Sequence, residues 1–307
     1  MKIRNVFLLL AVGLAAYFIF ESIGKDNLEK RHINDEIMGE TFIVFNLDNG
    51  EWLYNKNETN QVYPASTTKI MTALLALEKG SLDDKIVAGN EIEMGQVGES
   101  TAFLQQGHEY SLKQLLSALM LPSGNDAART IAIHIAKEEP GNKGLTNEEA
   151  IVYFTDLMND KAQKLGANST HFANPSGLHD DNHYTTAADM ALIVQAAMKN
   201  ETFKEIVNQE QYSDQNVTFN NTNLLLQRNS SYYYEGANGI KTGFTNEAGR
   251  CLVSSAVKNG QTIIAIVFGS TEEDIWRDSS ILLDYGFMAQ LEKEEAGTKL
   301  ASDNEEK

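Results

Sequence analysis

The fold class is decided by Thr41-Phe-Ile-Val-Phe-Asn-Leu47, Asp48-Asn-Gly50 and Glu51-Trp-Leu-Tyr54, together with the pattern that follows Pro64. Two runs rich in β-branched and aromatic residues flank an Asn-Gly pair, which is typical of a β-hairpin. After Pro64 the apolar residues recur at helical spacing from Ile70 to Leu77. The chain therefore enters its folded part as strand, turn, strand and helix.

The middle of the chain is predicted to be helical because its apolar runs follow recognisable helix starts. Capping boxes occur at Ser111-x-x-Gln114 and Thr146-x-x-Glu149, and Thr186-x-x-Asp189 opens a further helix. The helix that starts at Thr146 should stop at Gly166, because glycine readily adopts the left-handed conformation that ends helices.

The last third of the chain returns to strands. Arg250 to Lys258 and Thr262 to Phe268 are joined by Asn259-Gly260, and an amphipathic helix follows near Trp276 to Gln290. Strands at both ends of a helical middle predict an α/β (α+β) fold, in which one antiparallel β-sheet flanked by helices carries an inserted helical lobe at about residues 85–235. The folded domain should occupy residues 41–290.

The N-terminal segment has the features of an export signal. Lys2 and Arg4 precede an uncharged, largely apolar run from Asn5 to Phe20, and flanking positive charge keeps that end of a segment in the cytoplasm. Because no small-x-small cleavage site follows, we expect residues 1–24 to be a retained signal-anchor; cleavage would instead give a secreted protein. Residues 25–40 should be a polar linker, and residues 291–307 an acidic tail that need not fold.

Composition excludes some classes of function. The 307 residues include 43 Asp and Glu against 25 Lys and Arg, and no basic cluster is present, so nucleic acid is not an expected partner. The single cysteine, Cys251, rules out an intramolecular disulfide. Its apolar surroundings favour a buried structural thiol over a nucleophile.

Three short motifs carry the chemistry: Ser66-Thr-Thr-Lys69, Ser123-Gly-Asn125 and Lys241-Thr-Gly243. They match the S-x-x-K, S-x-N and K-T-G set of penicillin-interacting serine enzymes. S-x-x-K recurs at Ser22 and Ser255, but Ser22 lies at the membrane segment and Ser255 in a predicted strand, where positions i and i+3 face opposite ways. Only the first motif opens a helix, where its serine and lysine share a face.

A serine hydroxyl needs a base to take its proton, and no Ser-His-Asp set occurs at convincing positions. Lys69 can be that base for Ser66 if its pKa falls, which burial beside a second cation, Lys241, would cause. Ser123 can relay the proton to the leaving amine. Asn125 can hold Lys69 in place and bond a substrate amide.

The expected substrate contacts lie on the strand that carries Lys241. The helix N-terminus aims the backbone N–H of Ser66 at the developing oxyanion, and Phe244 should supply the second N–H. Gly243 leaves room for an extended peptide to pair with this strand edge. Lys241 and Thr242 would then face a substrate carboxylate.

With these motifs the sequence resembles the low-molecular-mass penicillin-binding proteins, specifically the serine D-alanyl-D-alanine carboxypeptidase family, peptidase family S11. The likeness runs from about Thr41 to Phe287 and extends past the three motifs. The further blocks are Tyr63-Pro-Ala-Ser-Thr-Thr-Lys-Ile-Met-Thr72, Leu121-Pro-Ser-Gly-Asn-Asp-Ala-Ala128, Asn174-Pro-Ser-Gly-Leu-His-Asp180 with His183-Tyr-Thr-Thr186, and Gly239-Ile-Lys-Thr-Gly-Phe-Thr245.

The resemblance implies a penicillin-binding-protein or β-lactamase-like transpeptidase fold and a role in peptidoglycan synthesis. It implies acylation of Ser66 by the penultimate D-Ala carbonyl of stem peptides that end in D-Ala-D-Ala, release of terminal D-Ala, and hydrolysis of the acyl-enzyme. It also implies covalent inhibition by β-lactams, and an extracytoplasmic location. Lys69, Ser123, Asn125 and Lys241 would have the roles described above.

Two departures from the family matter. Many members carry a C-terminal β-rich domain and a terminal amphipathic membrane helix, whereas this chain stops about twenty residues after Phe287. Anchoring should therefore fall to the N-terminal segment. Members also tend to have a downstream arginine that helps bind the substrate carboxylate, and the nearest candidate is Arg277, a residue or two out of register.

Other activities stay open at this stage. A DD-endopeptidase would use the same residues to cut peptidoglycan cross-links. A β-lactamase needs a deacylating Glu-x-x-Leu-Asn stretch, which is not evident. A penicillin sensor without turnover would lack a motif lysine or glycine, and none is missing. A metallopeptidase would rely on His179-Asp-Asp-Asn-His183, which has no third ligand in sight, so we expect neither metal nor cofactor.

Overall fold

The computed structural model describes residues 33–305, with side chains up to residue 295. The predicted signal segment lies outside the described residues, as does the first half of the predicted linker. The chain divides into two units, Met1–Met38 and Gly39–Lys307, and every element below belongs to the second. Within the described part, no helix combines the length and the apolar character needed to cross a membrane.

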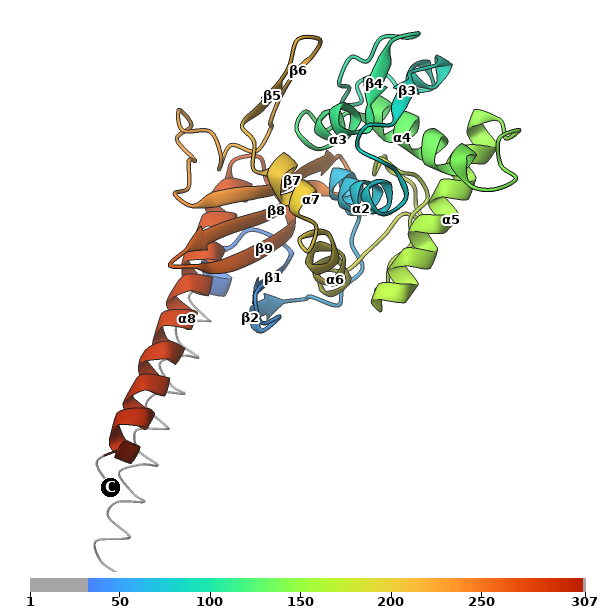
Figure 1. Ribbon diagram of the computed structural model, residues 1–307. Helices are drawn as coiled ribbons and strands as arrows, with labels where there is room; N and C mark the ends of the chain where they lie inside the picture. The colour runs from blue at the N-terminus through green and yellow to red at the C-terminus, as the bar shows by residue number, and fades with distance from the viewer. Residues whose placement is uncertain (1–32, 306–307) are drawn as a thin grey trace, which may run out of the picture. The chain divides into compact units, whose positions relative to one another are not determined.

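The second unit is built on one antiparallel sheet with the strand order β2-β1-β9-β8-β7. Its strands are β1 (Thr41–Asn46), β2 (Trp52–Lys56), β7 (Ala237–Thr245), β8 (Gly249–Lys258) and β9 (Gln261–Ser270). The predicted hairpin is β1 and β2, and β1 pairs along its whole length with β9. The two ends of the domain therefore lie side by side in the sheet (Figure 1).

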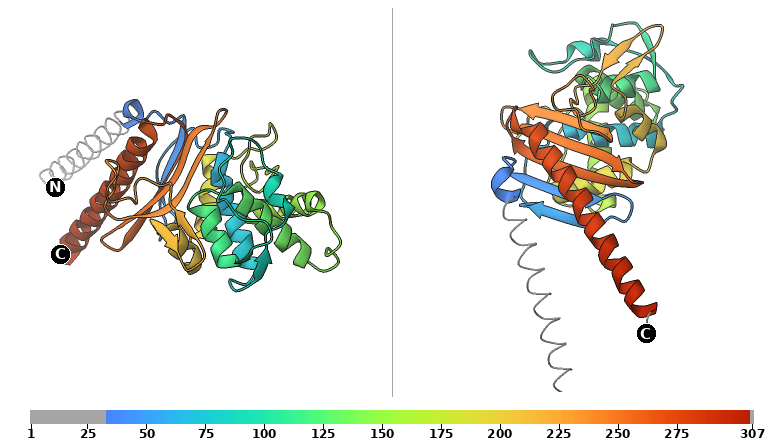
Figure 2. Two further views of the ribbon diagram at one scale, coloured as in Figure 1. Left: turned by 90° about the horizontal axis from the view of Figure 1, so that it is seen from above. Right: turned by 90° about the vertical axis from the view of Figure 1, so that its left-hand side faces the viewer.

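Helices cover both faces of the sheet because its inner strands are apolar on both sides. β1 is buried throughout, and β8 and β9 are buried over most of their length, as in strands that face two packed layers. α8 (Asp274–Glu305) packs against β8 and β9 on one face. The other helices of this unit lie on the opposite face (Figure 2).

The helical region lies between β2 and β7 and is centred on α2, in which every residue from Lys69 to Ala76 is buried. Its elements are η1 (Ala65–Thr68), α2 (Lys69–Lys79), β3 (Lys85–Val87), η2 (Asn90–Glu93), β4 (Glu109–Ser111), α3 (Leu112–Met120), α4 (Asn125–Glu138), α5 (Asn147–Leu165), α6 (Ala187–Ala197), α7 (Glu201–Val207), β5 (Gln211–Ser213) and β6 (Thr218–Asn220). The predicted fold class, an antiparallel sheet flanked by helices with a helical insertion, is confirmed.

The predicted helix boundaries are confirmed by their caps. Ser111 and Thr146 each form both hydrogen bonds of a capping box. The side chain of Thr186 accepts from a backbone N–H in the first turn of α6. Gly166 ends α5 in the left-handed conformation, with φ of 84°.

The structure differs from the sequence-based expectation at two places. Two small two-stranded sheets, β3–β4 and β5–β6, have strands of three residues, too short for an alternating pattern to reveal them. The closing helix does not end near Gln290 but continues to Glu305, so the segment that need not fold is largely helical. Leu, Glu, Lys and Ala dominate its first turns and favour helix, and Lys293 pairs with Glu51 at 2.5 Å.

Candidate active site

Ser66 lies at the start of a helical segment, in the 3₁₀ turn η1 that leads into α2. Thr67 Oγ1 donates to the carbonyl of Pro64 at 2.7 Å. On the other side, Gly177 lies so close that a Cβ there would come within 1.8 Å of the Ala65 carbonyl oxygen. Ala65 has φ of +46°, which is uncommon for a residue with a side chain. The candidate nucleophile is therefore held in a constrained turn.

Lys69 is fully buried one turn after Ser66 and makes three short contacts. Its Nζ lies 2.9 Å from Ser66 Oγ, 2.6 Å from Asn125 Oδ1 and 2.7 Å from the carbonyl oxygen of Ser176. Burial, followed by the charge of Lys241, lowers the pKa of Lys69 well below its ordinary value. The structure thus brings together the serine, lysine and asparagine that the sequence singled out.

Glu99 fixes the orientation of Asn125 and was not predicted from the sequence. Asn125 Nδ2 donates to Glu99 Oε2 at 3.1 Å, which turns Oδ1 of the amide toward Lys69. Arg129 donates to both Glu99 oxygens, at 3.1 and 2.7 Å, and both side chains are nearly inaccessible. Burial alone would raise the pKa of Glu99, but hydrogen bonds from Arg129 and Asn125 lower it. No sequence motif marks Glu99, because the contact joins residues from different loops and helices.

Ser123 presents an unsatisfied hydroxyl to the same space. The residue is 5% exposed, and its backbone φ is +67°, a strained value for serine. Its Oγ is buried and has no hydrogen-bond partner among the described residues. Because buried hydroxyls normally have a partner, this oxygen is available to a group that enters the pocket.

Lys241 and Thr242 lie on β7, the edge strand next to η1. Lys241 is 1% exposed, its Nζ donates to the carbonyl of Thr242 at 3.0 Å, and burial lowers its pKa to about 7. Thr242 Oγ1 lies 2.7 Å from Thr222 Oγ1, and both threonines line the pocket. These two hydroxyls form one polar end of the pocket.

Gly243 allows β7 to approach the Ser66 turn. A Cβ at Gly243 would lie 3.1 Å from the backbone nitrogen of Ser66 and 3.2 Å from Ala65 Cβ. Phe244 follows on the open edge of β7 and is half exposed. Because β7 pairs only with β8 within the sheet, its other edge can accept an extended peptide.

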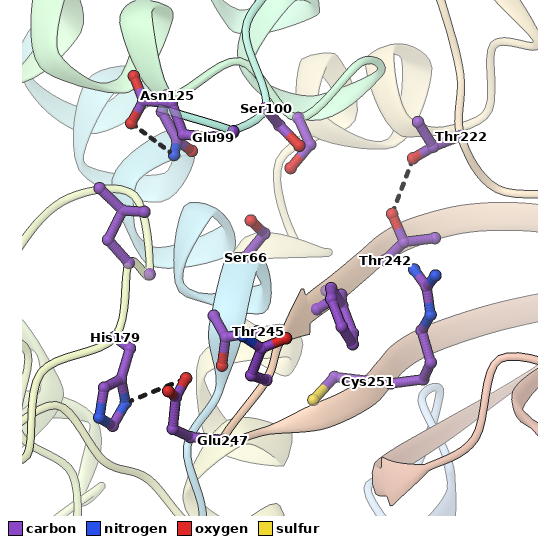
Figure 3. A pocket seen from close by; sticks show the side chains of 18 of the residues that line it. Ser66, Glu99, Ser100, Asn125, His179, Thr222, Thr242, Thr245, Glu247 and Cys251 are labelled. Carbon is purple, nitrogen blue, oxygen red and sulfur yellow. Dashed lines mark hydrogen bonds and ion pairs between the residues drawn. The ribbon is translucent and has the colours of Figure 1, made fainter. Parts of the chain in front are cut away.

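These residues surround a pocket of about 580 Å³. Ser66, Ser123, Asn125, Thr242 and Gly243 all line it. Figure 3 shows Ser66 near its middle, with Thr222 and Thr242 to one side and His179 and Glu247 to another. Thr242, Gly243, Phe244 and Thr245 of β7 line it beside the candidate nucleophile, so the pocket lies along this strand edge.

His183 and Cys251 have structural surroundings. The backbone N–H of Ala173 donates to His183 Nδ1 at 3.1 Å, so Nε2 carries the ring proton toward Thr68 Oγ1 at 2.8 Å. Burial lowers the pKa of His183 to about 4. Cys251 is 1% exposed, and burial raises the pKa of its thiol to about 12. The predicted burial of this thiol is confirmed, and Cys251 lines the pocket from β8.

The structure does not bring Arg277 to the pocket. Its side chain is 55% exposed and pairs with Asp274 one turn earlier in α8, at 3.3 Å. Ile275 and Trp276 line the pocket, whereas Arg277 does not. The physical reason is that successive side chains on a helix are rotated by about 100°. A position in the sequence therefore does not show which residue of α8 faces the pocket. The arginine that does line the pocket is Arg250, on β8.

Comparison with known proteins shows which family the chain is similar to. A family model described as D-alanyl-D-alanine carboxypeptidase matches residues 28–272. The D-alanyl-D-alanine carboxypeptidase DacF of Bacillus subtilis is 36% identical over 254 residues; the match covers 80% of this chain and 61% of that protein. The D-alanyl-D-alanine carboxypeptidase DacB2 of Mycobacterium tuberculosis is 35% identical, covering 81% of this chain and 82% of that protein.

Solved structures give the same result at the level of the fold. The crystal structure of the Streptomyces K15 DD-transpeptidase superposes with a TM-score of 0.75 at 33% identity, covering 82% of this chain and 98% of that one. The D-alanyl-D-alanine carboxypeptidase DacD of Francisella tularensis superposes with a TM-score of 0.70 at 28% identity, covering 81% and 70%.

Proposed function

The chain belongs to the D-alanyl-D-alanine carboxypeptidase family, peptidase family S11, and from this membership we propose that it removes the terminal D-alanine of peptidoglycan stem peptides through an acyl-enzyme on Ser66. One observation carries the proposal. Two of the three neighbours of Lys69 Nζ, Asn125 Oδ1 and the Ser176 carbonyl oxygen, can only accept hydrogen bonds. A neutral lysine has two N–H groups for these acceptors, so its lone pair faces the Ser66 hydroxyl.

Acylation follows from this arrangement. Lys69 takes the proton of Ser66 Oγ, and the oxygen attacks the carbonyl carbon of the penultimate D-Ala. The backbone N–H groups of Ser66 and Phe244 stabilise the oxyanion. The C–N bond then breaks, and the leaving D-alanine amine takes a proton from Lys69 through the free hydroxyl of Ser123.

Deacylation repeats the same chemistry with water. Lys69 accepts a proton from a water molecule that attacks the ester carbonyl, and the proton passes to Ser66 Oγ as the ester bond breaks. A β-lactam would acylate Ser66 by the same route, with its opened ring in place of the released D-alanine. Thr242 would contact the carboxylate of either ligand, and the buried Lys241 supports it by donating to the Thr242 carbonyl.

The test is product analysis with purified full-length protein. A pentapeptide that ends in D-Ala-D-Ala should release free D-alanine, and Ser66→Ala should abolish the release. A cross-linked peptide dimer serves as the competing substrate. If only the dimer is cleaved, the protein is an endopeptidase and not a carboxypeptidase. If Ser66→Ala still releases D-alanine, Ser66 is not the nucleophile.

Transfer to an amine is a second reaction that the same acyl-enzyme allows. The Streptomyces K15 relative is named a DD-transpeptidase among the solved structures and a D-alanyl-D-alanine carboxypeptidase among the curated proteins. Adding glycylglycine to the pentapeptide assay separates the two outcomes. A new peptide bond to glycylglycine, formed at the expense of the hydrolysed tetrapeptide, identifies transfer.

We propose that the enzyme works outside the cytoplasmic membrane and is tethered by its N-terminal segment. Lys2, Arg4 and the apolar run up to Phe20 support export and retention. Retention predicts that the protein stays in membranes after alkaline extraction and keeps its N-terminal residues in intact-mass analysis. A soluble extracellular form that has lost this segment would establish cleavage instead.

A further inference from the structure

We propose that Arg250, rather than Arg277, supplies the positive charge that binds the terminal carboxylate of the substrate. The inference rests on the proposed function, because it names a residue that binds the free C-terminal carboxylate of the same stem peptide. It concerns the end of the pocket where Thr222 and Thr242 meet.

The register of the sheet places Arg250 within reach of this end. Arg250 on β8 lies directly opposite Phe244 on β7, and its guanidinium carbon lies 4.4 Å from the centre of the Phe244 ring. Thr242 is two residues from Phe244 on the same strand, so it is the diagonal neighbour of Arg250. Such diagonal neighbours are within reach of long side chains.

The hydrogen-bonding capacity of Arg250 is only partly used. Its Nη2 pairs with Glu272 at 2.9 Å, and the Glu272 side chain is 78% exposed, so this pair is largely in water and weakly held. Its Nε is buried and has no acceptor among the described residues. A guanidinium can hold a carboxylate through two parallel N–H bonds. A substrate carboxylate can therefore replace Glu272 as the partner of Arg250.

The other cations near the pocket fit this task less well. Arg277 pairs with Asp274 on the exposed face of α8 and does not line the pocket. Lys241 is buried, and its Nζ donates to the carbonyl of its neighbour Thr242. Arginine also offers a planar fork of N–H donors that matches the geometry of a carboxylate. Among the described residues, Arg250 is the only lysine or arginine that lines the pocket.

Charge also decides which way the peptide lies in the groove. The opposite end of the pocket carries Glu247, whose side chain is 43% exposed and lies 3.9 Å from His179 Nδ1. A substrate carboxylate would be repelled there and attracted at the Thr222 and Thr242 end (Figure 3). The terminal residue therefore points toward Arg250, and the rest of the peptide runs past Ser66 toward Glu247.

The test compares Arg250→Gln with Arg277→Gln on two peptides that differ only at the C-terminus, one a free acid and the other a carboxamide. Hydrogen bonds between charged groups of this kind correspond to a factor of about 10 to 100. We expect Arg250→Gln to lower kcat/KM for the acid by that factor and to leave kcat/KM for the amide unchanged. Arg277→Gln should change neither value. The proposal is overturned if Arg277→Gln lowers kcat/KM for the acid, or if Arg250→Gln lowers kcat/KM for the acid and the amide by the same factor.

A second variant keeps the test decisive if Arg250→Gln folds poorly. Glu272→Gln removes the carboxylate that competes for Arg250, so KM for the acid should fall while KM for the amide stays constant; a rise in KM for the acid counts against the proposal. Thermal unfolding midpoints of all variants show whether they are folded. If the wild-type protein releases no D-alanine from the acid, the proposed function fails. If the wild-type protein does release D-alanine, the results for the Arg250 and Arg277 variants bear only on the role proposed for Arg250.

Discussion

Lys69 can act as a base only in its neutral form, so the pKa of this buried amine decides the pH range of activity. Burial and Lys241 lower that pKa well below 10.5. Activity should therefore rise with pH through the lowered pKa, well before the pH reaches 10.5. The measurement is kcat/KM for D-alanine release from pH 4 to 11. If activity is absent until about pH 10, the neutral-lysine mechanism is wrong.

Glu99 should matter for both stability and the pH profile, because it holds Asn125 and pairs with buried Arg129. Glu99→Gln leaves the Arg129 charge without its partner and should lower the free energy of unfolding by about 3 kcal/mol. The negative charge of Glu99 raises the pKa of Lys69. Its removal should therefore move the acid limb of the kcat/KM profile to lower pH.

Glu93→Gln is the matched control for Glu99→Gln, because Glu93 is exposed on the neighbouring η2 segment. It should leave both the urea unfolding curve and the acid limb unchanged. A Glu99→Gln protein that is destabilised but keeps the wild-type acid limb would show that Glu99 supports the fold and does not tune Lys69.

At the scale of elements, the site depends on the close approach of β7 to the η1 turn. A Cβ at Gly243 would meet the Ser66 nitrogen at 3.1 Å and Cys251 Cβ at 3.3 Å. Gly243→Ala should therefore push β7 away from Ser66 by a few tenths of an ångström and weaken the oxyanion contacts. We expect kcat to fall by roughly 10-fold or more, because small displacements at a reacting centre are costly.

Gly144→Ala is the control for that substitution, because a Cβ there meets nothing within 4 Å. It should leave kcat unchanged. Equal rates for Gly243→Ala and the wild-type protein would mean that the contact between β7 and η1 does not position the reacting groups.

At the scale of the whole molecule, stability should fall in acid because His183 joins the Ser66 turn to the loop at Ala173. The folded state keeps His183 neutral down to about pH 4, whereas the unfolded chain protonates it near pH 6.5. Between these values the unfolded state binds the additional proton, so the free energy of unfolding decreases as the pH falls. The contribution of His183 is about 3 kcal/mol.

Urea unfolding at pH 4.5 and pH 7 measures this effect in the wild-type protein and in His183→Gln. Protonation of carboxylates with lowered pKa values, among them Glu99 and Asp214, also destabilises the protein in acid. Comparing the two proteins separates the contribution of His183 from theirs. The stability difference between the two pH values should be smaller in His183→Gln. An equal difference in both proteins would assign the acid sensitivity to the carboxylates.

The family, the fold class and the main elements could be predicted from the amino-acid sequence, because they depend on local patterns. Alternating and β-branched runs predicted β1, β2, β8 and β9, and capping residues marked α3, α5 and α6. The three motifs also named Ser66, Lys69 and Asn125, which the structure brings within hydrogen-bonding distance. Their catalytic roles, like the boundaries of the lobe, stay predictions.

The distant side chains that complete the site could be identified only once the packing of the elements was known. Glu99 reaches Asn125 from 26 residues away, and no spacing rule relates a loop to a helix that packs on it. The choice between Arg277 and Arg250 depends on the rotation of α8 and on the register of β7 and β8, which are properties of packing. A sequence pattern fixes periodicity along one element, but distances between elements are set by how their buried faces fit together.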